Sequence, residues 1–239
     1  MKEIGSLCRD RGITFAIDTA QTAGIIPINM KEMNIDVLAF TGHKALMGCM
    51  GLGGLCVRKH VHLRQTRSGG TGVRSAYPYH LEEYPLRMEF GTPNMVGVAA
   101  LWAGQDWLDQ NGVAALHARE MRLARKLVDG LRQIERVRLY CCDHLDHHLS
   151  TVTMNVEGLE AGDVGIMLDV DHDIATRTGL HCAPLVHQQL GIVEKHGGVR
   201  FSIGAFNTEL QVDAAIHAVG EIARWAATRR VRQATVAAP

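Results

Sequence analysis

The chain has 239 residues, enough for one large domain or two small ones. Its 25 Lys and Arg residues balance 25 Asp and Glu residues, so bulk positive charge gives no basis for nucleic-acid binding. No apolar run approaches the roughly 18 residues of a membrane span, and the first residues lack the apolar core of a secretory signal. We therefore expect a cytoplasmic globular protein that binds neither nucleic acid nor membrane. Its six cysteines do not resemble a disulfide framework, so we expect free thiols.

The first part of the chain predicts strands buried in a sheet. A short helix ends near Gly12, and β-prone runs follow at residues 13–17 and 36–40. Continuous apolar runs between turns are typical of parallel strands buried on both faces. Asp18 and residues 41–44 come directly after the two runs, and ligands gather at the carboxyl ends of strands in open α/β sheets. We therefore expect Asp18 and residues 41–44 to face one site.

The middle of the chain is rich in glycine and loop. A glycine-rich stretch leads into the β-prone residues 55–57, and residues 64–94 form a long irregular segment. Loops of that length are typically functional or contact a partner. A helix is predicted over residues 97–107.

The remaining residues predict a second, smaller part of mixed type. Apolar residues at 123, 127, 131 and 134 recur with helical spacing, and strands are expected at residues 149–156 and 199–203. A capping box at residues 208–211 predicts the start of the last helix. We place a boundary between a sheet-rich α/β domain, residues 1–111, and an α+β domain, residues 112–239.

Three short groups carry residues with chemical potential: residues 18–21 (DTAQ), 41–44 (TGHK) and 181–184 (HCAP). Each group alone has a plain structural interpretation. Asp at a strand end is typical of caps and turns, Gly-His-Lys is typical of a loop, and a lone Cys is typical of a small buried apolar position. Together the groups point to a site for pyridoxal 5′-phosphate (PLP).

PLP acts as an electron sink, and that chemistry needs a protonated ring nitrogen and a lysine. A carboxylate beside the nitrogen favours its charged form, which is a role for Asp18. Lys44 is the candidate for the imine, or Schiff base, with the cofactor. Thr41 and His43 can hydrogen-bond a phosphate, and Gln21 lies close enough to Asp18 in sequence to reach the phenolic oxygen of the cofactor.

The chain resembles the class V aminotransferase group of fold-type I PLP enzymes, and within it the cysteine desulfurases and selenocysteine lyases. Five motifs occur in the order of the family: residues 18–21 (DTAQ), 41–44 (TGHK), 89–94 (EFGTPN), 177–184 (RTGLHCAP) and 200–208 (RFSIGAFNT). The resemblance implies an α/β fold in which a partial PLP-binding large domain, with a mostly parallel sheet, precedes a smaller α+β domain.

The resemblance gives the same cofactor roles to Lys44, Asp18, Gln21, Thr41 and His43, although the family more often has Ser where Thr41 stands. Thr92 resembles the residue that reaches the phosphate of the other subunit, which implies a homodimer. Arg200 resembles the clamp for the substrate carboxylate, and Cys182 the nucleophile that takes sulfur from L-cysteine and releases alanine. A sulfur-acceptor protein is a further implied partner.

The resemblance covers the later part of the family's chain only. We therefore expect a C-terminal fragment with exposed apolar surface, which would depend on a separate N-terminal half for activity. Other class V reactions remain open at this point, namely transamination and selenocysteine cleavage, as does an inactive remnant that only dimerises.

Arg177 is left without a role, and His181 is not expected to act as a base because neighbours in an extended segment point to opposite faces. No metal site is expected. Residues 141–148 are expected to form a polar turn between helix and strand, and the alternating aspartates at 169, 171 and 173 a strand edge.

Overall fold

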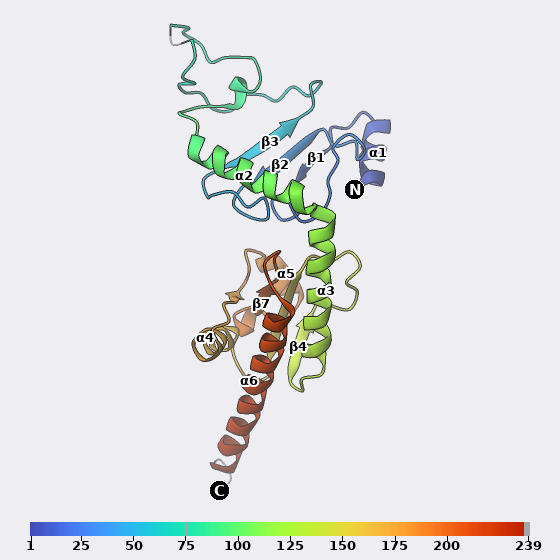
Figure 1. The fold of residues 1–239 in the computed structure, drawn as a ribbon, viewed down its shortest axis with the longest axis vertical. Helices are drawn as coiled ribbons and strands as arrows, with labels where there is room; N and C mark the ends of the chain where they lie inside the picture. Colours follow the sequence, from blue (N-terminus) through green and yellow to red (C-terminus); the bar gives the residue numbers. More distant parts are fainter. Residues whose placement is uncertain (75, 237–239) are drawn as a thin grey trace. The chain divides into compact units, whose positions relative to one another are not determined.

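The computed structural model describes residues 1–74 and 76–236 (Figure 1). The chain divides into two compact units, one from Met1 to Ala115 and one from Leu116 onward. No helix within the described residues is long and apolar enough to span a membrane.

The first unit contains a three-stranded sheet in the order β1-β2-β3 (Figure 1). Its strands are β1 (Ala16–Asp18), β2 (Val37–Thr41) and β3 (Gly53–Val57). β1 and β2 are parallel, as their apolar runs predict, whereas β3 pairs with β2 in the antiparallel direction. β1 begins at Ala16, three residues later than its β-prone run.

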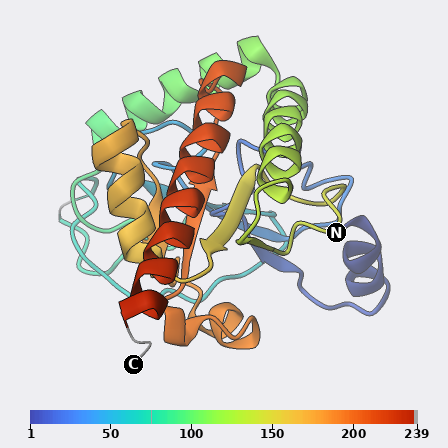
Figure 2. The same ribbon diagram turned by 90° about the horizontal axis from the view of Figure 1, so that it is seen from below.

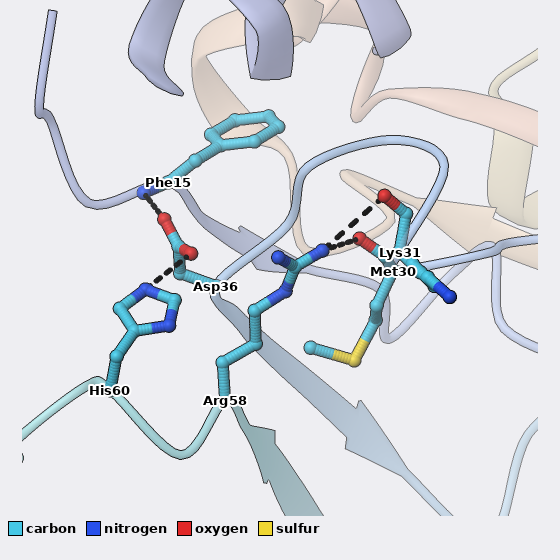
Figure 3. A network of polar contacts seen from close by, with 6 residues as sticks. All are labelled: Phe15, Met30, Lys31, Asp36, Arg58 and His60. Carbon is cyan, nitrogen blue, oxygen red and sulfur yellow. Dashed lines mark hydrogen bonds and ion pairs between the residues drawn. The ribbon is translucent and has the colours of Figure 1, made fainter. Parts of the chain in front are cut away.

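Polar contacts join the segments that flank the three strands (Figure 3). The Asp36 carboxylate accepts a hydrogen bond of 2.9 Å from the Phe15 backbone N–H and lies 3.0 Å from the His60 ring. Arg58 follows β3 and donates to the Met30 carbonyl at 2.8 Å. Since Phe15 precedes β1 and Asp36 precedes β2, the first contact sets the register of the parallel pair.

Two α-helices and one 3₁₀ helix accompany this sheet. They are α1 (Lys2–Asp10), η1 (Leu86–Met88) and α2 (Met95–Asn111). Asn94 caps α2 by accepting a hydrogen bond from the Gly97 N–H at 2.9 Å. A cavity of about 750 Å³ lies between α2 and the sheet and is lined by Leu38, Phe40 and Leu101, among others. α2 also carries exposed apolar residues, with Trp102 69% exposed.

The second unit contains a four-stranded antiparallel sheet in the order β4-β5-β7-β6. Its strands are β4 (Val137–Tyr140), β5 (Thr151–Val156), β6 (Arg177–Gly179) and β7 (Gly198–Ser202). Its helices are α3 (Val113–Arg132, which begins in the first unit), α4 (Ala161–His172), α5 (Pro184–Gln189), η2 (Val193–Lys195) and α6 (Glu209–Val236).

The core of this unit lies between the sheet and the three long helices α3, α4 and α6 (Figure 2). Alternate residues of β5, Val152, Met154 and Val156, are at most 1% exposed. Leu127 of α3 and Leu168 of α4 pack into the same cluster. This packing confirms the predicted α+β character of this part, with antiparallel strands that bury one face against helices.

The predicted capping box at the start of α6 is confirmed. The Thr208 hydroxyl accepts a hydrogen bond from the Gln211 N–H at 3.3 Å, and the Gln211 side chain accepts one from the Thr208 N–H at 3.0 Å. These two bonds satisfy backbone donors that have no partner within the helix.

Two local predictions for this unit are wrong. Asp169 and Asp171 lie within α4, and Asp173 caps it in the left-handed conformation, with φ of 56°. The alternation of aspartates with other residues has the period of a strand. The apolar residues Val164 and Leu168 instead have helical spacing, and their burial in the core stabilises the helix. Residues 141–148 connect β4 to β5, and so join two strands.

Candidate functional site

Two predicted site residues end neighbouring parallel strands of the first unit. Asp18 is the last residue of β1 and pairs in register with Ala39 of β2, whereas Thr41 is the last residue of β2. Parallel strands end at the same edge of a sheet, so both side chains belong to the carboxyl edge, where ligands bind in open α/β sheets. Asp18 is exposed and Thr41 is half-buried.

The turn after β1 fixes Asp18. Thr19 is buried, and both its N–H and its hydroxyl donate to the Ala39 carbonyl, at 2.8 and 2.7 Å. One carboxylate oxygen of Asp18 accepts from the Ala20 N–H at 2.8 Å. This is the local hydrogen bond of a turn aspartate, and within the described residues no ion pair engages the carboxylate. The second oxygen therefore stays available to a ligand.

The turn after β2 presents Lys44. Gly42 donates its N–H to the Leu52 carbonyl, and Gly48 donates to the Gly42 carbonyl, both at 2.8 Å. These bonds close a compact loop from which Lys44 projects as an exposed side chain. Among the described residues, no hydrogen bond or ion pair engages its amine.

A close approach joins the two turns. Gly24 adopts a left-handed φ of 86°, and a Cβ atom there would lie 2.4 Å from the Ala45 carbonyl oxygen. Only a residue without a side chain allows this contact. Because Ala45 is the neighbour of Lys44, the contact holds the segment that follows Asp18 against the segment that carries Lys44.

The groups in these turns fit PLP in their chemistry. Thr41 and His43 lie side by side, with 3.1 Å between the hydroxyl oxygen and Nδ1, and can both donate to a phosphate. Asp18 supplies an open carboxylate oxygen for a ring nitrogen, and Lys44 an amine without a partner. Gln21 is an exposed residue of the turn after Asp18. Thr92 is also exposed, on the loop before α2, and the structure records no contact between it and these turns.

The second unit places Cys182 in a turn between β6 and α5. Both His181 and Cys182 have left-handed φ angles, 52° and 59°. The expectation of an extended segment here is therefore wrong. Cys182 is exposed, and the Arg177 guanidinium donates to its sulfur at 2.8 Å.

Arg200 lies on β7, directly opposite Arg177 of β6 in the antiparallel register. Paired residues of neighbouring strands point to the same face of a sheet, so the two guanidiniums share one face. Burial lowers the pKa of Arg200, the positive charge of Arg177 lowers it further, and Cys182 opposes this shift. The Arg200 Nε also donates to the Ser202 hydroxyl at 3.0 Å.

Two imidazoles support the turn. His181 donates from Nε2 to the Arg177 carbonyl at 3.0 Å, and His187 from Nδ1 to the Ala183 carbonyl at 2.9 Å. The two rings meet edge to face, with their centroids 5.0 Å apart. Desolvation by burial lowers the pKa of His181, the hydrogen bond to the Arg177 carbonyl opposes this shift, and the positive charges of Arg200 and Arg177 add to it.

The structure thus gathers the predicted residues into two groups, one in each unit. Asp18, Thr41, His43 and Lys44 belong to the first group, and Cys182 and Arg200 to the second. Sequence reasoning missed Arg177 as a member of the second group. Nothing in the sequence indicated that Arg177 contacts Cys182. The contact depends on the left-handed conformation of two residues in the turn between them.

The chain is similar in sequence and fold to proteins named cysteine desulfurase. A probable cysteine desulfurase of Pyrococcus abyssi is 32% identical over 228 residues, which are 94% of this chain and 56% of that protein. The structure of a cysteine desulfurase from Thermococcus onnurineus NA1 superposes with a TM-score of 0.81 at 33% identity, over 93% of this chain and 56% of the other. One from Escherichia coli gives a TM-score of 0.76 at 26% identity, over 92% and 54% of the two chains.

The chain spans about half the length of the relatives that it matches. The family model for class-V aminotransferases matches residues 1–215. The motifs, the fold and this match agree, and the chain belongs to the class-V aminotransferase family of PLP-dependent enzymes.

Proposed function

We propose that the chain is the part of a cysteine desulfurase that carries the cofactor lysine and the sulfur-accepting cysteine. The observation that carries the proposal is the exposed Cys182 thiol, which receives a hydrogen bond from one arginine and lies near a second. A sulfur nucleophile needs a thiolate, and cations favour the thiolate. Transamination does not require a thiol at this position.

The residues of the first unit would hold PLP and move protons. Asp18 pairs with the ring nitrogen, Gln21 contacts the phenolic oxygen, and Thr41 and His43 bind the phosphate. When bound, PLP supplies an electron sink for the negative charge that develops at the substrate Cα. The Lys44 amine, which is exposed, removes the Cα proton.

The residues of the second unit would bind the substrate and take its sulfur. The planar guanidinium of Arg200 pairs with the carboxylate of L-cysteine. The Cys182 thiolate attacks the substrate sulfur, so a sulfur–sulfur bond forms while the carbon–sulfur bond breaks. The products are alanine and a persulfide on Cys182, whose outer sulfur passes to an acceptor protein in the cytoplasm.

Thr92 has a different place in the proposal. It is exposed on the loop before α2 and belongs to the phosphate site of a second copy of the chain. The exposed apolar residues of α2, such as Trp102, are consistent with coverage by another protein surface. The proposed assembly is therefore a homodimer.

Persulfide mapping tests the proposal. The chain is incubated with PLP and L-cysteine, alone and with the part of the Pyrococcus abyssi relative that this chain does not match. Thiols and persulfides are then alkylated and located by peptide mass spectrometry. We expect a persulfide on Cys182 together with alanine, and more of both in the second arm.

Cys182→Ser is the matched variant, and the exposed thiols of Cys49 and Cys141 are controls within the same chain. The variant should lose both products. Alanine formation that survives in Cys182→Ser, persulfide spread evenly over the three thiols, or keto-acid in place of alanine would contradict sulfur transfer through Cys182.

A further inference from the structure

Arg177 makes two contacts with the turn that carries Cys182. Its guanidinium donates to the Cys182 sulfur at 2.8 Å, and its carbonyl oxygen accepts from His181 Nε2 at 3.0 Å. The side chain and the backbone of one residue therefore hold two consecutive residues of the turn. Both of these residues have the left-handed φ that side-chain-bearing residues rarely adopt, so the turn needs external support.

Two positively charged guanidiniums, those of Arg177 and Arg200, lie near the Cys182 sulfur. Within the described residues, no carboxylate forms an ion pair with Arg177 or Arg200. The two guanidiniums lie on paired positions of β6 and β7, where their like charges repel. An anionic sulfur beside Arg177 relieves this repulsion, and the lowered pKa of Arg200, which Cys182 counteracts, reflects the same balance.

His181 is poorly placed to serve as the base for the thiol. Its Nε2 carries the hydrogen that it donates to a carbonyl, and desolvation by burial lowers the pKa of the ring, which makes it a weak base. The hydrogen bond from the Arg177 guanidinium is direct and favours the charged form of the sulfur, and the positive charge of Arg200 acts in the same direction.

We propose that Arg177 is a positioning residue that holds Cys182 as a thiolate in its strained turn, while Arg200 is left to the substrate carboxylate. The assignment rests on the proposed sulfur transfer through Cys182. It concerns the protein without substrate, so alkylation chemistry tests it independently of turnover.

The test is the rate at which iodoacetamide alkylates Cys182, followed by peptide mass spectrometry. The thiolate displaces iodide, so a sulfur–carbon bond forms as the carbon–iodine bond breaks. At about pH 6.5 an ordinary thiol is only about 1% ionised, whereas at about pH 9.5 most thiols are ionised. We expect Arg177→Met to slow alkylation of Cys182 at least ~5-fold at the lower pH and less than ~2-fold at the higher pH. The exposed Cys141 should react at an unchanged rate in both conditions.

Two further variants make the result specific. Arg138→Met removes a guanidinium from β4 of the same sheet, where it stacks on Tyr140, and should leave Cys182 unchanged. Arg177→Lys keeps the charge without the planar fork and should give an intermediate rate. Added salt should narrow the difference between wild type and Arg177→Met, because the contact is exposed.

Three results would overturn the proposal. One is equal slowing by Arg177→Met at both pH values, which would show a change of access. Another is a wild-type Cys182 that reacts no faster than Cys141 at the lower pH. The third is slowing by Arg138→Met as large as by Arg177→Met. If Arg177→Met does not fold, as judged by circular dichroism, two measurements test the proposal instead. They are the alkylation rate of Cys182 in Arg177→Lys and the rate of Cys182 relative to Cys141 in the wild type. If the alkylation rates are as expected but no persulfide forms on Cys182, the result would count against the proposed function alone.

Discussion

Substitution of Gly24 by Ala should separate the two turns that carry Asp18 and Lys44. Gly24 has a φ of 86°, and an added Cβ would lie 2.4 Å from the Ala45 oxygen and 2.6 Å from its carbonyl carbon. Real Cβ atoms do not approach backbone atoms this closely, so one of the turns must move. Lys44, next to Ala45, moves with it.

The magnitude follows from two costs. A residue with a side chain in the left-handed conformation costs about 1–2 kcal/mol, and overpacking against backbone costs about 1–3 kcal/mol. Gly24→Ala should therefore destabilise the turns by about 2–5 kcal/mol. Gly12→Ala is the matched control, because Gly12 has a φ of 65° but no atom within 4 Å of its missing Cβ. It should incur the conformational cost alone.

Amide hydrogen exchange measures the effect locally. Gly42 and Gly48 donate the hydrogen bonds that close the Lys44 loop, so their amides report its opening. Gly24→Ala should accelerate their exchange at least ~5-fold more than Gly12→Ala does, which corresponds to about 1 kcal/mol. The helices of the second unit should be unaffected. Equal exchange in the two variants would refute the contact and, with it, the argument that the two turns form one site.

Three other predictions concern the second unit. Burial raises the pKa of Glu120, and the hydrogen bond from Ser150 offsets part of this shift. The folded protein therefore holds the proton more tightly than the unfolded chain, and stability falls as the pH rises above the usual Glu range of about 4.3. Glu120→Gln should remove this fall, seen by urea unfolding at about pH 4 and about pH 8; a parallel pH dependence in both proteins would contradict it. Thr208→Ala removes one bond of the capping box and should cost about 1 kcal/mol in the same assay, with fraying of the first turn of α6 seen by amide exchange. Leu168→Ala empties a fully buried position and should cost about 2–5 kcal/mol; a loss below 1 kcal/mol would show that the core is loosely packed there.

Patterns with a clear period or a specific end signal predicted the fold well. The apolar runs before Asp18 and Thr41 predicted β1 and β2, and the capping box predicted the start of α6. The leucine stripe predicted α3, although Ile134 lies beyond the end of that helix. These signals are local, since each depends on residues within a few positions of one another.

Features that depend on distant contacts were not predictable in the same way. β6 has three residues and is stabilised by its pairing with β7, about 20 positions later, so its own sequence carries no strand signal. The contact of Arg177 with Cys182 needs the left-handed turn at His181, which no propensity favours. The close approach of Gly24 to Ala45 likewise appears only when both turns are folded.

Borohydride trapping tests whether Lys44 and its neighbours bind PLP. The chain is mixed with PLP and reduced, so that any imine becomes a stable adduct, and the modified lysine is identified by peptide mass spectrometry. We predict labelling of Lys44 in large excess over the exposed Lys31 and Lys59, with a marked loss of that excess in Thr41→Val. Labelling spread evenly over the three lysines, or unchanged by Thr41→Val, would contradict the claim.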